Sequence, residues 1–235
     1  MLKTAIFGTS YIYDHRRAAV VRLWIRLAAK LNPGFPLTIV DSASPVPVPE
    51  ECGVEVIRFP DNVGHLAGGG KDGWGRAFTY CLKLAVERGM DYVAVVDTDI
   101  VLCKPVGPIF DMMRAKGIKC AMPIGDRYPF PENGLVFFDV AWLKRTGFAD
   151  RYGWEDSSAT RLPEWHCRDL CGRDLHILTD LKGRRNDHGD VTADNLSETY
   201  PTGCDWLTHC VDTSPYAKLL ELNGLDVAEL GWQTV

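Results

Sequence analysis

The chain has 235 residues, of which 46% are hydrophobic and 24% charged, with a formal net charge of −5 and a pI near 5.7. This length suits one large domain or two small ones, and the composition excludes a disordered chain. The acidic balance and the lack of a basic stripe argue against a general nucleic-acid binder.

Strand-like and helix-like segments alternate along the first half of the chain, which predicts an α/β layered fold. Short apolar runs indicate strands, and apolar residues at helical spacing indicate helices. Glycines and prolines mark the ends of both kinds of segment. We expect strands over 2–7, 37–40, 54–59 and 92–96, helices over 15–31 and around 78–85, and loops over 8–10 and 44–49.

The pattern is looser in the second half. A loop and a short helix are expected over 103–116, strands over 119–122, 135–138 and 175–178, and a helix over 155–170. No internal repeat or linker separates these segments, so we expect one domain. We divide it into a nucleotide-binding half over 1–103, an acceptor and catalytic half over 104–204, and a C-terminal helical extension over 205–235.

The start of the chain passes at once into a strand, without the longer apolar segment of a secretory signal. No stretch approaches the roughly 20 apolar residues that cross a bilayer. We therefore expect a soluble, cytoplasmic protein whose eight cysteines are reduced core thiols. Structural zinc is the weaker alternative, because the Cys-x3-Cys spacing lacks the paired short loops of a zinc ribbon. Its ligands would come from His166, Cys167, Cys171, Cys204, His209 and Cys210.

Two carboxylates follow the apolar run 92–96, in the triplet Asp97-Thr98-Asp99. Open α/β sheets bind ligands at the carboxyl ends of their strands. Alternation along an extended chain would direct Asp97 and Asp99 the same way. Hard oxygen donors so placed suit Mg²⁺ or Mn²⁺, which take their remaining ligands from waters and substrate phosphates. A pair of strand-end aspartates that only cap loops is the alternative.

A glycine-rich segment, 62–71, lies between a strand and a helix. Its backbone N–H groups and Lys71 are suited to a diphosphate, as is Arg76 in the first turn of the next helix. The glycine spacing fits neither a Walker A loop nor a dinucleotide fingerprint. A surface loop and a solvated arginine are the alternatives.

The second half supplies a turn and an acidic segment. Asn133-Gly134 precedes a strand, so its backbone can approach a sugar closely. The segment Gly153-Trp154-Glu155-Asp156 places an aromatic residue and two acids at the expected start of the next helix. A carboxylate beside a tryptophan suits a site that holds a sugar face and deprotonates its hydroxyl. Acids that cap the helix are the alternative.

The order of these segments resembles the inverting, metal-dependent glycosyltransferases of the GT-A fold, with family 2 and the β-1,4-galactosyltransferase-like family 7 as the nearest patterns. The likeness runs over residues 3–190. Gly75-Arg76-Ala77 also looks like the Asn-Arg-Ala segment of the galactosyltransferase-like group, with Gly75 in place of asparagine. The resemblance implies a Rossmann-like α/β/α sandwich with a central, mostly parallel, mixed sheet.

The resemblance also assigns roles. Glu155 and Asp156 would be catalytic, with Asp156 as general base, and Trp154 and Glu155 would hold the acceptor. Asp99 would ligate the metal, and Asp97 would face the ribose or a metal-bound water. A histidine in several such enzymes completes the metal shell, and here it would be His188, with His209 as competitor. The donor would contact Thr9, Asp41, which usually reads uracil, Asn62, Gly64, Arg76, Asp97, Asn133 and Gly134.

The sequence thus predicts a hexosyltransferase-type enzyme that uses a nucleotide sugar, most readily a UDP-sugar, and Mn²⁺ or Mg²⁺. The acceptor is a glycan, a lipid-linked sugar, a protein or a small molecule. The alternatives are a retaining glycosyltransferase, a sugar-phosphate nucleotidyltransferase, and a non-catalytic module that binds a nucleotide sugar or a glycan. No motif names the donor sugar, the acceptor or the oligomeric state.

Overall fold

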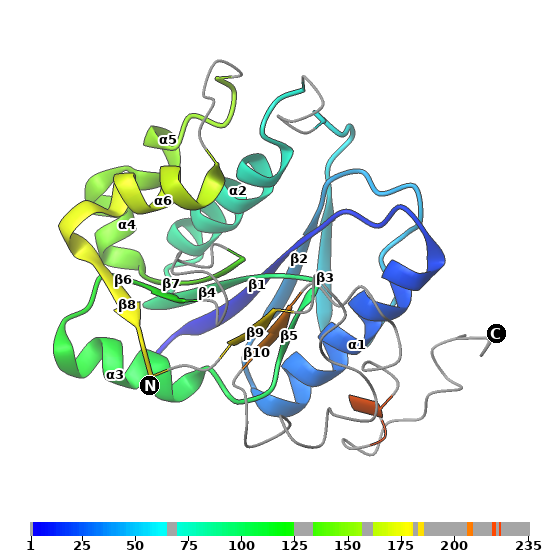
Figure 1. Ribbon diagram of the computed structural model, residues 1–235, viewed down its shortest axis with the longest axis horizontal. Coiled ribbons are helices and arrows are strands. Elements are labelled where there is room, and N and C mark those ends of the chain that lie inside the picture. Colours follow the sequence, from blue (N-terminus) through cyan, green and yellow to red (C-terminus); the bar gives the residue numbers. More distant parts are fainter. Residues whose placement is uncertain are drawn as a thin grey trace.

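A seven-stranded sheet lies at the centre of the protein, in the strand order β3-β2-β1-β4-β7-β6-β8 (Figure 1). The structure is a computed structural model that describes residues 2–64, 70–124, 134–156, 162–180, 183–185, 206–208, 218, 219 and 221. Only β7 runs against its neighbours in this sheet. The strands are β1 (Thr4–Ser10), β2 (Leu37–Asp41), β3 (Val54–Arg58), β4 (Tyr92–Asp97), β6 (Cys120–Pro123), β7 (Leu135–Asp139) and β8 (Leu175–Leu178).

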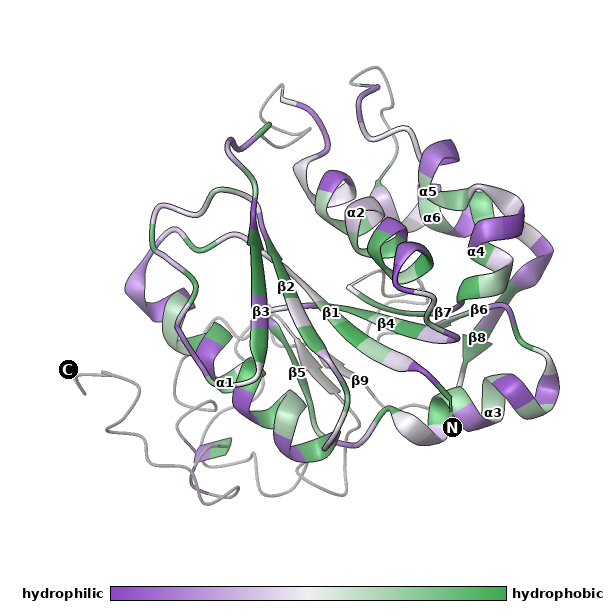
Figure 2. Cartoon of the chain, turned by 180° about the vertical axis from the view of Figure 1, so that it is seen from behind, coloured by the Kyte–Doolittle hydropathy of each residue, from purple (hydrophilic) through white to green (hydrophobic). Residues whose placement is uncertain are grey.

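Helices cover both faces of the sheet and bury a separate apolar cluster on each (Figure 1). One face carries α1 (His15–Leu31) and α3 (Gly107–Lys116), and the other carries α2 (Gly73–Glu87), α4 (Val140–Thr146), α5 (Phe148–Arg151) and α6 (Pro163–Cys171). Figure 2 shows hydrophobic residues along the central strands and hydrophilic stripes on the helices. The predicted α/β/α sandwich with a mostly parallel, mixed sheet is confirmed.

The direction of winding reverses between β1 and β4, which are parallel neighbours. The chain proceeds from β1 to β2 and β3 on one side, and continues from β4 to β7, β6 and β8 on the other. Such a switch point leaves a crevice outside the carboxyl ends of the two central strands, where α/β proteins bind ligands. Here those ends are Thr9, Ser10 and Asp97.

Side-chain caps position the two helices that flank this switch point. Asp14 caps α1 by accepting the backbone N–H of Arg17 at 2.8 Å. Asp72 caps α2 by accepting the N–H of Gly75 at 2.7 Å. Each cap satisfies a donor that the first helical turn leaves unpaired, so both helices begin at a defined residue beside the sheet.

The predicted strands of the central sheet are all present, but residues 8–10 are strand rather than the expected loop. The reason is pairing on both sides: Gly8 and Thr9 each pair with β2 and with β4, and Ser10 pairs with Asp41. Parallel strands on either side supply backbone partners that no local sequence signal announces. The expected helix over 155–170 starts late, at Pro163, and residues 154–156 form a turn.

A second, three-stranded sheet was not predicted. It consists of β5 (Ile100–Leu102), β10 (Trp206–Thr208) and β9 (Gly183–Arg185). Its strands are three residues long, too short for a periodic pattern to reveal them, and β10 pairs with β5 across about a hundred residues of sequence. Helices α4 and α5 also lie where we predicted no element. The expected C-terminal extension over 205–235 falls largely outside the described residues.

The six cysteines in the described ranges are free thiols, as predicted, and only Cys52 among them is exposed. Burial raises the pKa of the Cys81 thiol and of the Cys120 thiol. No set of three or more metal-ligating side chains gathers within the described residues, so these show no zinc site. Of the helices described, none has both the length and the apolar character needed to cross a membrane.

The end of α2 is attached to the outer strands by an ion pair whose strength depends on pH. Arg88 donates to both carboxylate oxygens of Glu55, at 2.7 and 2.9 Å, and this hydrogen bonding lowers the pKa of Glu55. A lowered pKa in the folded state gives stability that is present above the ordinary value of 4.5 and is lost as the pH falls through the folded value.

We therefore expect Glu55→Gln to lower the free energy of unfolding at pH 7, and the difference from wild type to shrink as the pH falls below the folded pKa of Glu55. Urea denaturation at pH 7 and pH 3 measures both differences. Glu50→Gln, in the exposed loop before β3, is the control. A difference between wild type and Glu55→Gln that is equal at both pH values would contradict this role of Glu55.

Candidate active site at the carboxyl ends of β1 and β4

Asp97 ends β4 at the switch point, directly beside Thr9 of β1. The Thr9 hydroxyl donates to the Asp97 carboxylate. The indole N–H of Trp74, in the first turn of α2, donates to both Asp97 oxygens, at 2.8 and 3.0 Å. Donors from two elements therefore fix one half-buried carboxylate at the edge where a ligand is expected.

Gly134 brings backbone against this carboxylate. Its carbonyl accepts the Asp97 N–H at 2.7 Å, and a Cβ at this position would lie 2.8 Å from Asp97 Oδ2 and 2.6 Å from Ile100 Cδ1. A side chain would therefore displace Asp97 or β5. The backbone at Gly134 therefore packs closely against Asp97, and the expected approach of this backbone to a sugar stays a prediction.

Asp99 faces different partners from Asp97. The chain turns at Thr98 and Asp99, so strand alternation does not continue past Asp97, and the expectation that both carboxylates point the same way is wrong. Asp99 Oδ2 lies 3.8 Å from Arg17 Nη1 of α1, whereas Asp97 contacts Trp74 of α2 on the other face of the sheet. The buried Thr98 stabilises the turn by bonding to Thr9 and Ser10.

Asp99 suits a divalent cation better than Asp97 does. Its carboxylate is 24% exposed, and its contact with the half-exposed Arg17 is long. Surface ion pairs of this kind contribute about 0.2–1 kcal/mol. The described residues contain no complete set of protein ligands for a metal. Mg²⁺ and Mn²⁺ can take one or two carboxylates from a protein and further ligands from waters and phosphates, which is compatible with Asp99 as one ligand.

Tyr152 joins the first turn of α2 to the acidic segment. Its hydroxyl donates to the helix cap Asp72 at 3.1 Å, and its ring lies 6.3 Å from that of Trp74. A Cβ on Gly75 would lie 2.5 Å from Tyr152 Cε1. The glycine that stands where the galactosyltransferase-like segment has asparagine is thus the residue that admits this tyrosine.

Trp154 lies beside the positive charges near the start of α2. Its ring centroid is 5.5 Å from the Arg76 guanidinium and 5.7 Å from the Lys71 ammonium. Arg76 also stacks over Phe59 at 4.2 Å and forms a forked hydrogen bond with Asp61. The residues predicted to meet the diphosphate and the acceptor therefore lie side by side.

Glu155 and Asp156 follow Trp154 as exposed residues of a turn. Gly153, at φ 64°, allows the chain to reverse after α5, and the Asp156 N–H donates to its carbonyl at 3.0 Å. The N-cap of α6 is Leu162, which has no side-chain cap bond, so the predicted alternative that these acids cap the helix is wrong.

Asp41 ends β2 but turns its carboxylate into the protein. It is fully buried, accepts from the Ser44 hydroxyl and from the Ser44 N–H at 3.2 Å, and lies 3.6 Å from Arg58 Nη1. These bonds hold the loop after β2 in place. Farther along, Asn62 accepts the Gly64 N–H at 2.8 Å, which closes a tight turn at the start of the glycine-rich segment.

Three of the predicted site residues lie outside the described residues, namely Asn133, His188 and His209. His166, which the sequence linked to zinc, belongs to the packing around Tyr152 instead. Its Nε2 donates to the Tyr152 carbonyl at 2.6 Å, and the two rings are 4.7 Å apart. His166 thus connects α6 to the same tyrosine.

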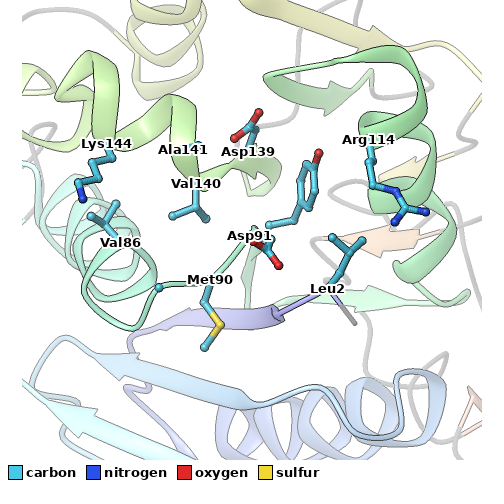
Figure 3. A pocket seen from close by; sticks show the side chains of 11 residues that line it. Leu2, Val86, Met90, Asp91, Arg114, Asp139, Val140, Ala141 and Lys144 are labelled. Atoms are coloured by element: carbon cyan, nitrogen blue, oxygen red, sulfur yellow. The ribbon is translucent and has the colours of Figure 1, made fainter.

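A pocket of about 360 Å³ lies at the opposite end of the strands (Figure 3). It is lined by apolar side chains from Leu2, Val86 and Met90, with Arg114 and Lys144 on opposite sides. It opens near the start of β1 and β4, the amino ends of the strands. The pocket is therefore separate from the carboxylates at the switch point.

Comparison of the fold finds glycosyltransferases. The bifunctional glycosyltransferase WbbM is similar over 98% of this chain and 51% of its own, with a TM-score of 0.64 and 11% identity. The galactosyltransferase LgtC, solved with donor and acceptor sugar analogs, is similar over 94% of this chain and 95% of its own, with a TM-score of 0.55 and 12% identity. S. aureus TarS 1–349 in complex with UDP is similar over 84% of this chain and 63% of its own, with a TM-score of 0.53 and 13% identity. The chain thus spans about half the length of WbbM.

No family model and no curated protein sequence matched the chain. At 11–13% identity the structural likeness establishes the fold, and the GT-A fold that the sequence predicted is confirmed. Activity must be argued from the site itself.

Two residues of the site escaped sequence reasoning. Trp74 adjoins Gly75-Arg76-Ala77, and Tyr152 lies within the segment that leads to Asp156, yet neither received a role. The available signal was a glycine in the first helical turn, which indicates close approach by another group. It could not reveal which group approaches, because Tyr152 is distant in sequence.

Gly75→Asn tests the packing of Tyr152 on α2. The new side chain would collide with Tyr152 and with the Asp72 cap, so we expect a loss of about 1–3 kcal/mol in the free energy of unfolding. Gly117→Asn is the control, because Gly117 ends α3 with open space around it and asparagine tolerates its left-handed conformation. Chemical denaturation measures both, and equal stability of the two variants would refute the packing argument.

Proposed function

We propose that the protein is a glycosyltransferase that moves a sugar from a nucleotide sugar, most readily a UDP-sugar, to an acceptor hydroxyl with inversion. The observation that carries the proposal is the position of Asp97 at the switch point of a GT-A fold, where Thr9 and Trp74 donate to its carboxylate. The first turn of α2, which supplies Trp74, also supplies Arg76, which contacts Trp154. UDP as the nucleotide is supported by TarS, a protein of similar fold solved with UDP.

The donor nucleotide lies across the carboxyl ends of β2, β1 and β4. Asp97 accepts hydrogen bonds from the ribose, while Thr9 and the loop held by Asp41 border the nucleoside. Arg76 and the backbone around Asn62 and Gly64 face the diphosphate, and Asn133 with Gly134 borders the sugar. The partial positive charge at the N-terminus of α2 adds to the attraction for phosphate.

Asp99 and His188 would hold Mn²⁺ or Mg²⁺, and Asp97 would face the ribose or a water bound to the ion. When bound, the ion supplies Lewis-acid neutralisation of the charge on the departing diphosphate. Arg17 Nη1 lies 3.8 Å from Asp99 Oδ2 and partly balances its charge.

The acceptor lies against the Trp154 ring and is oriented by Glu155. Asp156 removes the proton from the attacking hydroxyl as that oxygen bonds to C1 of the donor sugar and the C1–O bond to the diphosphate breaks. Attack and departure occur on opposite faces, so the configuration at C1 inverts. A binding module would not need a base here, so Asp156 discriminates between transfer and binding alone.

Asp156→Asn tests the base. We expect a fall of about 10²–10⁴-fold in kcat for transfer, with binding of UDP unchanged, because the amide cannot accept the proton. The assay offers a panel of nucleotide sugars and acceptors. Asp150→Asn, an exposed acid nearby on α5 that pairs with Lys83, is the control and should keep wild-type transfer. Normal turnover by Asp156→Asn would show that Asp156 is not the base.

Asp99→Asn tests the metal site through a binding readout. We expect at least about tenfold weaker binding of Mn²⁺ in the presence of UDP, because a carboxylate ligand is replaced by a neutral amide. Paramagnetic resonance of free Mn²⁺ measures the binding. Asp91→Asn, at the other end of β4, is the control. Transfer that needs no divalent ion would contradict the roles of Asp99 and His188.

Anomeric analysis of the product separates the inverting reaction from a retaining one. Binding of UDP without transfer or hydrolysis of any nucleotide sugar would favour the non-catalytic module.

A further inference from the structure

We propose that Trp74 is a positioning residue: its indole N–H orients the Asp97 carboxylate toward the donor nucleotide. The inference rests on the proposed function and assigns a task to a residue that neither contacts substrate there nor forms part of the metal site. It is drawn from the hydrogen bonds at the switch point and from the packing that fixes the indole ring.

The geometry of the contact restricts the Asp97 side chain. The Trp74 Nε1 atom lies 2.8 Å from Oδ1 and 3.0 Å from Oδ2, so one N–H is shared between both oxygens. A shared donor aligns the plane of the carboxylate with the N–H direction, whereas a bond to a single oxygen leaves rotation open. The Thr9 hydroxyl adds a second donor from the neighbouring strand.

The indole ring is itself immobilised. It stacks on Phe78, one helical turn along α2, with centroids 4.7 Å apart and planes 14° from parallel. The ring of Tyr152 lies against it from another side, and Tyr152 is anchored on the helix cap Asp72. The N–H therefore comes from a side chain with little freedom to follow a moving carboxylate.

Preorganisation of this kind affects binding. A carboxylate that is already oriented pays less conformational entropy when the ribose hydroxyls bind, and a hydrogen bond to a charged group is stronger than one between neutral groups. Without the indole N–H, Asp97 would sample orientations that do not face the donor. The consequence is weaker nucleotide binding, with no direct change in the proton transfer at Asp156.

Trp74→Phe removes the N–H and keeps an aromatic ring on Phe78. We expect UDP to bind about tenfold more weakly, as measured by calorimetry with Mn²⁺ present. The matched control is Trp142→Phe, because Trp142 also donates its indole N–H to a carboxylate, that of Asp174 at 2.8 Å, but belongs to α4. The control should lose thermal stability and bind UDP like wild type.

A double-mutant cycle with Asp97→Asn separates positioning from general packing. If Trp74 acts through Asp97, the tenfold effect of Trp74→Phe disappears in the Asp97→Asn background. An effect of equal size in both backgrounds would overturn the inference, as would wild-type UDP binding by Trp74→Phe.

Should Trp74→Phe fail to fold, replacement of Trp74 by benzothienylalanine removes the same N–H and preserves both rings, and the same outcomes apply. Failure of the proposed function itself looks different. In that case wild-type protein binds no UDP, and the inference falls with it, whereas wild-type binding that is insensitive to Trp74 contradicts the inference alone.

Discussion

The parallel pairing of β1 with β4 is the constraint on which the site depends. It places Thr9 opposite Asp97, with β2 and β3 on one side of the pair and β7, β6 and β8 on the other. The crevice at the end of these strands is thus a consequence of strand order. Because β7 pairs antiparallel with β4, Gly134 at its start reaches the same edge, and the backbone of the second half meets the carboxylate of the first.

The first turn of α2 connects the parts of the site. Asp72 caps the helix and accepts from Tyr152, Trp74 holds Asp97, and Arg76 contacts Trp154. The first turn of α2 therefore contacts both Asp97, proposed to bind the donor nucleotide, and the segment around Trp154, proposed to bind the acceptor. The absence of a side chain at Gly75 makes this arrangement possible, since any Cβ there would occupy the space of Tyr152.

The sequence predicted the features that depend on hydrophobic periodicity and on the glycines and prolines that end helices and strands. The central strands, the bounds of α1 and the position of Asp97 at a strand end follow from short apolar runs and from helical spacing. Long-range pairing could not be predicted in this way. The strand character of Gly8 to Ser10 depends on neighbours that arrive later in the chain, and the short strand β5 follows a turn that the Asp97 triplet does not reveal.

Side-chain partners were equally hidden. Asp97 and Asp99, separated by one residue, suggested a single pair, but the chain turns at Thr98, and Asp97 accepts from Trp74 of α2 while Asp99 lies near Arg17 of α1. Asp41 is buried and accepts from Ser44, a contact with the following loop that the sequence did not indicate, and its expected contact with the nucleoside stays a prediction.

The central claim is that a nucleotide binds at the carboxyl ends of β1 and β4. A crystal structure of the protein soaked with UDP and Mn²⁺ tests it most directly. We predict density for UDP across these strand ends, with the ribose at Asp97 and the ion at Asp99. Nucleotide bound in the pocket beside Leu2 and Arg114, at the amino ends of the strands, would contradict the account.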